Sequence, residues 1–457
     1  MTSFSVAGSH VVVVGAARSG LAAAALAARR GARVTVSEVR PAPADVAGAA
    51  SLRRLGVVLE LGGHRPGTFD AADLIVLSPG VSPRIPPVAR ARAAGVPVIS
   101  EIELAARWLR GRLVAVTGTK GKSTTTALSG RMLDTGGRRA VVGGNIGQAL
   151  SSQVDASTPD AIHVVEVSSF QLELTATFRP WIAVCLNLSP DHLDRHGTLE
   201  EYARAKARIF ANQTRDDAMV INADDPRVLQ MARAGRARSL RFAVSRTLSE
   251  GVHVTGDAIA HRSGGVDRPL VPLSAVRLPG RHLLSDVAAA AAVGTLAGVD
   301  PDAMTRAVQS FAGLEHALEF VAEHRGVRYV NDSKATNPAA ARAAIECFDR
   351  DLVVILGGRF KGGRMADLGA ALAARGAAVV AIGEARPRIR EALGDIVTVV
   401  DADSMTAAVA AARRLARAGG TVLLAPACAS LDMFSDYSAR GRAFKEAVGR
   451  LSGADEP

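Results

Sequence analysis

Short apolar runs alternate with alanine-rich, helix-like stretches along most of the chain. The first runs, at residues 11–14, 33–37 and 73–77, have the length of strands and are followed by glycine, glutamate or serine. Residues 21–28, between the first two runs, contain only alanine and leucine, which favour a helix. Strands that alternate with helices predict a parallel sheet with helices on its faces, here a Rossmann-like α/β arrangement.

The alternation continues to the C-terminus. A linking helix is expected at residues 101–110. Further strands are expected at 162–167, 182–187 and 218–222, and helices at 199–212, 285–298 and on to Phe311. A third α/β region begins near Gly313, with strands at 329–331, 352–356, 378–382, 396–400 and 421–425. Because 457 residues exceed one ordinary core, we expect three domains, at residues 1–101, 102–312 and 313–457.

Composition narrows the class of function. The net charge of +11 suggests nucleic-acid binding, but the arginines are dispersed and aromatic residues make up only 4% of the chain. No apolar run approaches a membrane span, and the N-terminus lacks the pattern of a secretion signal. Three scattered cysteines provide neither a disulfide framework nor a CxxC metal site. We therefore expect a cytoplasmic protein with no nucleic-acid partner and no membrane insertion, and we expect a monomer.

Residues 114–126, VAVTGTKGKSTTT, form the most informative motif. An apolar strand enters a glycine turn, and a helical pattern opens at Lys122. Such a loop directs backbone N–H groups and a lysine at a polyphosphate, and its serine hydroxyl can coordinate Mg²⁺. The general P-loop pattern has glycine where this chain has Val116, so the turn is a tighter variant. The alternative is a glycine-rich turn without a ligand. The predicted ATP-binding loop comprises Gly118, Thr119, Lys120, Gly121, Lys122, Ser123 and Thr124.

Lysine is rare, since only six of the 55 basic residues are lysine. A chain that otherwise uses arginine is expected to keep lysine where a compact ammonium or a reactive amine is needed. Lys206 lies in the helical stretch YARAKARIF, whose apolar neighbours turn this face partly inward. A buried ammonium is costly unless it is paired, and a desolvated lysine can be neutral enough to react. Lys445, in an amphipathic pattern, is expected to be solvated.

The first glycine turn reads Gly15-x-Ala17-x-x-Gly20, and Glu38 ends the second strand where a ribose-binding acid would lie. With alanine at the middle glycine position this is a weak dinucleotide motif. The alternative is a close-packed turn without a ligand.

Acidic and histidine residues follow two strands of the central region. Glu166 ends one strand, where a carboxylate beside a P-loop can hold nucleotide Mg²⁺; the alternative is a role in the turn. His192 and His196 have the i, i+4 spacing of a zinc site, but Pro190 and Gly197 indicate a loop and no third ligand is evident. One histidine that assists a phosphate or Mg²⁺ is therefore favoured. The neighbouring acids could instead cap the next helix.

Three polar segments of the last region also follow strands. They are residues 331–338, with Thr336 or Asn337 as N-cap before Pro338, and residues 357–363 and 426–432. The second is glycine-rich but lacks the serine or threonine of a nucleotide loop. Because strand C-terminal ends form the ligand-binding edge of open α/β sheets, the three segments could line one pocket for a carboxylate or phosphate.

Six motifs together resemble the Mur ligase family, in order and across essentially the whole chain. They are VTGTKGKSTTT, GGNIG at residues 143–147, EVSSFQLE, DHLDRH, NDSKATNP and PACASLDMF. The resemblance implies a Rossmann-like N-terminal domain that binds a UDP group, a central P-loop ATPase-like domain, and a C-terminal Rossmann-like α/β domain with a glutamate site. It further implies a cytosolic enzyme of peptidoglycan precursor synthesis. Such an enzyme uses ATP to add D-glutamate to UDP-N-acetylmuramoyl-L-alanine through an acyl phosphate.

The same resemblance implies roles for individual residues. Lys122, Glu166, His192 and Lys206 would be catalytic, and Asp286, Asp332 and Lys334 would join the loop in binding ATP. The UDP-substrate site would comprise Arg18, Ser19, Glu38, Arg40, Ser78, Gly80, Asn145 and His192. The glutamate site would comprise Thr336, Lys361, Ser430, Leu431 and Tyr437. Ser123 and Glu166 would hold one Mg²⁺. A CO₂-derived carbamate on Lys206 would hold a second with Glu166 and His192.

The chain departs from the family pattern at three of these positions. Ala317 stands where the family often has an arginine that contacts the nucleotide, and Tyr437 where phenylalanine is frequent. Asp286 replaces an asparagine used to read adenine, and an ionised carboxylate cannot donate a hydrogen bond.

Three other classes of protein remain open at this point. The first is a sister ligase that adds another amino acid or extends folate. The second is an NAD-dependent oxidoreductase, which the P-loop and the missing middle glycine disfavour. The third is a nucleotide-binding protein without catalysis, which the lysine and acid set disfavours.

Overall fold

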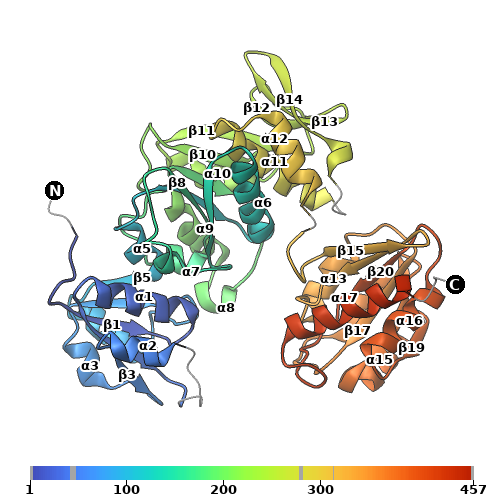
Figure 1. Ribbon diagram of the computed structural model, residues 1–457, viewed down its shortest axis with the longest axis horizontal. Coiled ribbons are helices and arrows are strands. Elements are labelled where there is room, and N and C mark those ends of the chain that lie inside the picture. Colours follow the sequence, from blue (N-terminus) through green and yellow to red (C-terminus); the bar gives the residue numbers. More distant parts are fainter. Residues whose placement is uncertain (1–3, 42–47, 277–280, 312, 454–457) are drawn as a thin grey trace. The chain divides into compact units, whose positions relative to one another are not determined.

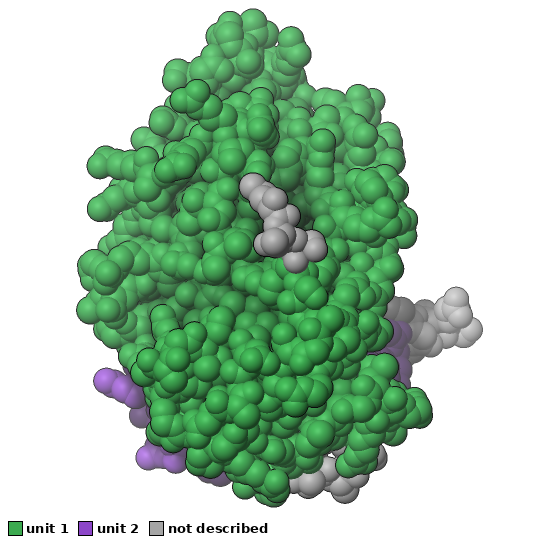
Figure 2. Space-filling model, turned by 90° about the vertical axis from the view of Figure 1, so that its left-hand side faces the viewer, with its two compact units in different colours: residues 1–276, 284–308 green, residues 277–283, 309–457 purple. Residues whose placement is uncertain are grey.

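The computed structural model describes residues 4–41, 48–276, 281–311 and 313–453, and many of its elements are labelled in Figure 1. The chain forms two compact units, coloured separately in Figure 2. The first comprises residues 1–276 and 284–308, and the second residues 277–283 and 309–457. None of the helices in the described ranges is long and apolar enough to cross a bilayer.

The first unit begins with a five-stranded parallel sheet of order β3-β2-β1-β4-β5. Its strands are β1 (His10–Val14), β2 (Arg33–Glu38), β3 (Val58–Leu61), β4 (Leu74–Leu77) and β5 (Val98–Ser100). Its helices are α1 (Arg18–Arg29), α2 (Ala49–Arg54), α3 (Pro66–Asp70), α4 (Pro86–Ala93) and α5 (Glu101–Ala106). The strand order changes direction between β1 and β4, and such a switch point is where open α/β sheets bind ligands.

A nine-stranded sheet forms the rest of this unit, with order β14-β13-β12-β11-β10-β9-β6-β8-β7. Its strands are β6 (Arg112–Thr117), β7 (Arg139–Gly144), β8 (Ala161–Glu166), β9 (Ile182–Cys185), β10 (Ala218–Asn222), β11 (Arg238–Ala243), β12 (Gly251–Thr255), β13 (Ala258–Ser263) and β14 (Val266–Pro272). Its helices are α6 (Lys122–Thr135), α7 (Ser169–Leu172), α8 (Leu193–His196), α9 (Leu199–Ala207), α10 (Pro226–Met231), α11 (Arg281–Leu296) and α12 (Pro301–Gln309). Short 3₁₀ turns occupy Leu150–Ser152, Arg208–Phe210, Ala232–Ala234 and Leu273–Ala275.

One buried hydrophobic cluster joins the two sheet regions of this unit. Leu26 of α1 belongs to the same buried cluster as Ile102 of α5 and Leu150 and Val154 of the nine-stranded part. The N-terminal and central regions therefore form one body.

The second unit contains a six-stranded sheet of order β15-β16-β20-β17-β18-β19, in which only β15 pairs antiparallel. Its strands are β15 (Glu319–His324), β16 (Val327–Asn331), β17 (Leu352–Gly357), β18 (Ala378–Ile382), β19 (Val399–Asp401) and β20 (Thr421–Leu424). Its helices are α13 (Pro338–Ile345), α14 (Gly369–Ala373), α15 (Arg386–Leu393), α16 (Met405–Leu415) and α17 (Tyr437–Gly453), with 3₁₀ turns at Met365–Leu368 and Gly383–Ala385.

The side chains of β17 alternate between the two faces of the sheet, and both faces are covered. Val354 and Leu356 lie in one buried cluster, while Val353 and Ile355 lie in another, on the opposite face. A strand buried on both faces reads as a continuous apolar run, and such runs mark parallel strands between helices.

The predicted α/β class with three sheet regions is confirmed, but several elements differ from expectation. The linking helix ends at Ala106, because Trp108 and Leu109 instead pack against the central core. Helix α9 ends at Ala207 and gives way to a 3₁₀ turn, and the strand expected at 396–400 begins only at Val399. The sequence analysis missed β3, β5, β7 and β15. It also missed the sheet extension β11–β14, whose strands mix buried and less buried positions.

Candidate active site

The glycine-rich loop lies at the C-terminal end of β6, which pairs with both β8 and β9. Gly118 and Gly121 have φ values of 154° and 81°, which residues other than glycine rarely adopt. A neighbouring side chain fixes the loop, because the Oδ1 of Asn187 accepts hydrogen bonds from the N–H groups of Thr119 (3.1 Å) and Lys120 (2.8 Å). These two amides are therefore engaged within the protein, and the first turn of α6 has no side-chain cap. The backbone N–H groups that we expect to donate to a phosphate are therefore those of residues 121–124.

Lys122 and Asp286 lie at this loop. The ammonium of Lys122 donates to the carbonyl of Thr119 at 2.9 Å. Asp286 is 4% exposed, accepts a hydrogen bond from the Thr125 hydroxyl at 3.3 Å, and lies so close to Gly121 that a Cβ there would be 2.1 Å from its Oδ1. Burial raises the pKa of Asp286 well above its usual range. Burial thus favours the neutral form of the carboxyl, which can donate a hydrogen bond as an amide does.

Glu166 connects the loop to the first domain. It is 3% exposed, and its two carboxylate oxygens accept from the Ser123 hydroxyl at 2.5 Å and from the Asn145 amide at 2.9 Å. Arg18, at the start of α1, donates to the Asn145 carbonyl at 3.2 Å. The structure therefore brings together predicted nucleotide, metal and UDP-substrate residues in one hydrogen-bonded line.

Lys206 is buried, with only 1% of its surface exposed. Its Nζ donates to the carbonyl of Gly118 at 2.7 Å and lies 4.6 Å from the centre of the Tyr202 ring. Burial, helped by repulsion from Lys122, lowers the pKa of Lys206 to about 7. Near neutral pH a large fraction of this side chain is therefore an uncharged amine.

His192 and His196 have different environments. His192 has the positive φ of 52°, its side chain is 50% exposed, and its ring lies 5.0 Å from that of Phe170. His196 is buried, and its Nε2 is hydrogen-bonded to the Ser169 hydroxyl at 2.9 Å. Within the part of the chain that the structure describes, no three His, Cys, Asp or Glu side chains gather as a metal cluster. Of these two histidines, only His192 is exposed enough to contact a ligand.

One expectation for this segment was wrong, and one alternative left open by the sequence does not hold. Residues 193–196 form a short helix, α8, although Pro190 and Gly197 indicated a loop. The acids do not cap the next helix, because the N-cap of α9 is Thr198, whose hydroxyl accepts from the N–H of Glu201 at 3.1 Å.

The predicted UDP site surrounds the first glycine turn. A Cβ at Gly20 would lie 1.9 Å from the carbonyl of Gly15, so the turn requires glycine there, and Ser78 donates to the same carbonyl at 3.1 Å. Glu38 accepts from the N–H of Ala16 at 2.9 Å and pairs with Arg40 at 3.0 Å. The hydrogen bond from Arg40 lowers the pKa of Glu38 to about 2. Arg18 and Gly80 are exposed and Ser19 is partly exposed, so this edge of the sheet is open to a ligand.

In the second unit, a buried arginine joins the three polar segments. Arg440 of α17 is 1% exposed and donates to the hydroxyl (2.9 Å) and carbonyl (2.8 Å) of Ser333, and to the carbonyls of Cys428 (3.0 Å) and Gly357 (3.4 Å). The acceptors lie at the C-terminal ends of three strands. Ser333 and Cys428 follow β16 and β20, and Gly357 is the last residue of β17. Burial lowers the pKa of Arg440 only to about 10, so the guanidinium remains charged at neutral pH.

The remaining predicted residues lie on these segments. Asn337 caps α13 by accepting from the N–H of Ala340 at 2.8 Å, which leaves the side chain of Thr336 to another role. Ser430 is buried, whereas Leu431 and Tyr437 are 60% and 41% exposed and Lys334 and Lys361 are also exposed.

Asp332 is the buried acid of this group. It accepts from the N–H of Leu318 at 3.1 Å, and burial raises its pKa to about 7.

Sequence reasoning missed two residues and misjudged one. Asn187 and Arg440 hold the two sets of loops, and their polar side chains at a strand end and in the last helix gave only a weak indication. Lys445 is not simply solvated, since it bonds Glu315 at 2.7 Å and Glu319 at 3.0 Å.

Family models match the chain in three successive segments. They are the Mur ligase MurD-like N-terminal domain at residues 9–100, the Mur ligase middle domain at 116–294, and the Mur ligase glutamate ligase domain at 318–428. The chain therefore belongs to the Mur ligase family and is an enzyme of the ligase class.

Its curated relatives include several named UDP-N-acetylmuramoylalanine–D-glutamate ligase. The one from Acidobacterium capsulatum is 46% identical and the alignment covers 96% of both chains. The one from Geotalea daltonii is 43% identical, with 98% of this chain and 99% of the relative covered. Among solved structures, the MurF ligase from Thermotoga maritima in complex with ADP has a TM-score of 0.58 at 17% identity, covering 98% of this chain and 96% of its own. That likeness supports the fold.

Proposed function

We propose that this protein uses ATP to join D-glutamate to UDP-N-acetylmuramoyl-L-alanine, a step of peptidoglycan precursor synthesis in the cytoplasm. The observation that carries the proposal is the line of Ser123, Glu166 and Asn145 beside the P-loop, which links a phosphate site to the first domain. The names of relatives that match nearly the whole chain support the particular substrates.

Phosphoryl transfer would be the first step. The terminal carboxylate of the substrate attacks the γ-phosphorus of ATP; a new O–P bond forms, the bond to ADP breaks, and an acyl phosphate results. The ammonium of Lys122 and the amides of residues 121–124 would stabilise charge on the transferring group. Asn145 would orient the reacting end of the substrate.

Amide formation would follow. The amine of glutamate attacks the acyl carbon, inorganic phosphate leaves, and the amine loses a proton. The resulting amide bond joins the carbonyl carbon to the glutamate nitrogen.

The oxygen donors of this site fit Mg²⁺. Ser123 and Glu166 present a hydroxyl and a carboxylate to each other at 2.5 Å, and Mg²⁺ prefers oxygen ligands. Bound there, the ion would neutralise charge on the phosphate oxygens. His192, through its exposed ring, would contribute to a second site with Glu166.

Lys206 would complete the second site as a carbamate. Its neutral amine can attack CO₂, forming an N–C bond and releasing one proton, and the product is an anion. The pKa of about 7 supports this proposal because the uncharged amine is populated near neutral pH. An ammonium at the same place would repel a cation.

In the second unit, Lys361, Thr336 and Ser430 would offer a cation and two hydroxyls to the glutamate carboxylate, with Leu431 and Tyr437 beside them. Asp332 and Lys334 would contact the nucleotide. We propose the domain bounds 1–101, 102–312 and 313–457 for the UDP, ATP and glutamate functions, and a monomeric enzyme.

An amino-acid panel tests the function. The enzyme, ATP, Mg²⁺ and UDP-N-acetylmuramoyl-L-alanine are incubated with D-glutamate, L-glutamate, D-aspartate or meso-diaminopimelate, and phosphate release and product are measured. D-glutamate is expected to be preferred, and aspartate, one methylene shorter, should be poorly used. Preference for L-glutamate would overturn the stereochemistry. Preference for the diamino acid would place the chain with a sister ligase.

A further inference from the structure

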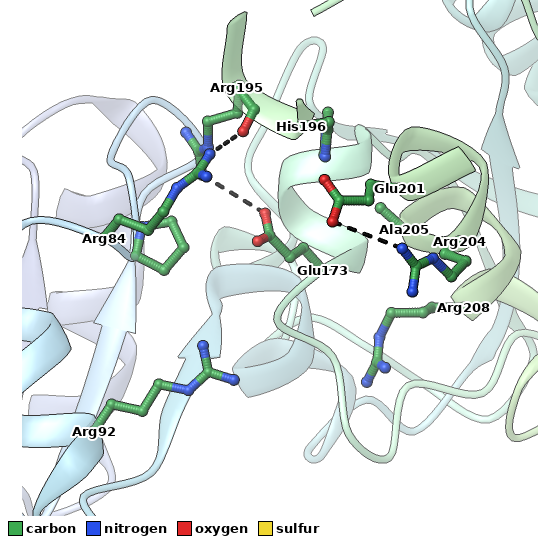
Figure 3. A pocket seen from close by; sticks show the side chains of 10 residues that line it. Arg84, Arg92, Glu173, Arg195, His196, Glu201, Arg204, Ala205 and Arg208 are labelled. Atoms are coloured by element: carbon green, nitrogen blue, oxygen red, sulfur yellow. Dashed lines mark hydrogen bonds and ion pairs between the residues drawn. The ribbon is translucent and has the colours of Figure 1, made fainter. Parts of the chain in front are cut away.

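A pocket of about 450 Å³ in the first unit is rich in arginine (Figure 3). Five guanidinium groups line it, from Arg84, Arg92, Arg195, Arg204 and Arg208. Figure 3 shows Arg84 and Arg92 of the first domain on one side and Arg204 and Arg208 on the other. None of the lining residues belongs to the predicted ATP, UDP-substrate, glutamate or metal sets.

The charges in this pocket do not balance. Only two carboxylates line it, Glu173 and Glu201, which lie 3.9 Å from Arg195 and 3.6 Å from Arg204. His196 also lines the pocket, and burial lowers its pKa, so it stays neutral near neutral pH. The pocket therefore holds three more positive than negative charges at that pH.

The arginines are held in different ways. Arg84 donates to the carbonyl of Arg195, and Arg208 donates to the carbonyls of Leu172 and Thr175, so backbone acceptors position both guanidinium groups without neutralising them. The side chain of Arg92 makes no hydrogen bond or ion pair with any residue in the described ranges. Arg90, on the same helix α4, is instead paired with Asp70 at 3.0 Å.

We propose that this pocket binds a phosphate group, carried by inorganic phosphate or by a small phosphate monoester. Guanidinium groups match the geometry of phosphate oxygens and bind them through charge-assisted, often bidentate hydrogen bonds. A phosphate dianion offsets most of the excess charge, whereas an amino acid would bring its ammonium into a positive pocket. The volume lies within the usual range of small-molecule sites, roughly 300–1,000 Å³.

Binding would connect two parts of the first unit. Arg84 and Arg92 belong to the segment from β4 to α4, and Arg204 lies on α9, the helix that carries Lys206. A bound phosphate would thus hold the first domain against the helix of the reactive lysine.

Isothermal titration of the full-length protein, without ATP and at low salt, tests the proposal independently of ligation. The probes are inorganic phosphate and ribose 5-phosphate, which distinguish a free ion from a phosphate monoester by which binds more tightly. Lys122→Ala is the background, so that phosphate binding at the P-loop is weakened. Arg92→Ala and Arg204→Ala should each reduce affinity about tenfold, the effect of losing one charge-assisted hydrogen bond. Arg90→Ala, the matched control, should bind like its parent.

Three results would overturn the proposal. The first is equal affinity in the Arg92→Ala, Arg204→Ala and Arg90→Ala variants. The second is binding that is present in the wild type and abolished by Lys122→Ala, which would place the phosphate at the P-loop. The third is that succinate, a dicarboxylate of similar charge, binds at least as tightly as both phosphates, which would assign the pocket to carboxylates.

Discussion

Among the residues that the structure describes, each unit has one lysine or arginine that is almost completely buried, and the two differ in chemistry. Lys206 and Arg440 are both 1% exposed, and both donate to backbone carbonyls of loops that we propose bind ligands. Burial lowers the pKa of Lys206 to about 7, near the pH of a cell, but lowers that of Arg440 only to about 10. The lysine can therefore become a neutral, reactive amine, whereas the arginine stays charged and holds three loops together through its hydrogen bonds.

The number of hydrogen bonds matches this difference. Arg440 makes four, at 2.8–3.4 Å, and links three strand ends. Lys206 makes one short bond, to Gly118, and a longer one of 3.5 Å to the hydroxyl of Thr117. A buried charge is stable where its donors are satisfied, so these contacts fit a structural role for Arg440 and agree with the reactivity that we propose for Lys206.

The largest expected effect is on the rate of phosphate release, and it follows from substitutions at the P-loop and at Glu166. Lys122→Ala and Glu166→Ala should each lower the rate of phosphate release by about 10²–10³, because each removes a charge that acts on the transferring phosphate or its metal. The melting temperature should change little for Lys122→Ala. Near-normal phosphate release by either purified variant would contradict the assignment of the loop.

Substitution of Lys206 separates reactivity from charge. Lys206→Arg keeps a cation but cannot form the carbamate, so it should be inactive, as should Lys206→Ala. Added formate or acetate should partly restore Lys206→Ala by supplying carboxylate oxygens to the metal, and phosphate release measures this. An active Lys206→Arg enzyme would rule out the carbamate.

Matched methionine substitutions should have opposite effects on stability. Lys206→Met removes a poorly paired buried amine and should raise the free energy of unfolding at pH 6 by roughly 1–4 kcal/mol. Arg440→Met leaves three backbone carbonyls without donors and should lower it by roughly 3–5 kcal/mol. Thermal and urea unfolding measure both, and Arg442→Met, on the exposed face of the same helix, is the control for Arg440. Effects of the same sign would remove the distinction.

The sequence predicted the two regions unequally. The P-loop and Glu166 were predicted because glycine, lysine and acid at fixed places after strands have few other uses. Lys206 was predicted because lysine is rare in this chain and its helix has apolar neighbours that turn this face partly inward. Arg440 was missed because one arginine among many in amphipathic helices gives no local pattern, and its role depends on three strand ends that only the sheet order brings together. Asn187 was missed for the same reason, since its partners Thr119 and Lys120 lie far away in the chain. The hairpins of β12–β14 were missed because each strand is buried over only two or three consecutive positions, so none has a long apolar run.

The loops that Arg440 joins, where we propose that glutamate binds, offer a smaller and more specific test. Lys361→Ala should raise the KM for glutamate about tenfold, as expected for one lost charge-assisted hydrogen bond, and leave the KM for ATP unchanged. Arg364→Ala is the control, since it lies in the same loop, is 82% exposed and pairs with Asp367 at 3.4 Å. Steady-state kinetics with each substrate varied separately measure the difference. Equal KM values for glutamate in the two variants would remove Lys361 from the site.

The pH dependence of Lys206 gives the last test of the comparison. With a pKa of about 7, its neutral fraction rises about tenfold between pH 6 and pH 8, so bicarbonate-dependent activation should rise across that range.

The free energy of unfolding should also depend on pH through Lys206, because its pKa in the folded chain lies below the ordinary value of 10.5. Between about pH 7 and 10.5 the unfolded chain binds a proton that the folded chain lacks, so this group makes the free energy of unfolding rise with pH there. Lys206→Met should remove that contribution, whereas Arg440→Met should leave the slope below pH 9 unchanged, because Arg440 stays charged. An identical slope in wild type and Lys206→Met, measured by urea unfolding at pH 7, 8 and 9, would mean that the lysine is charged in the folded protein.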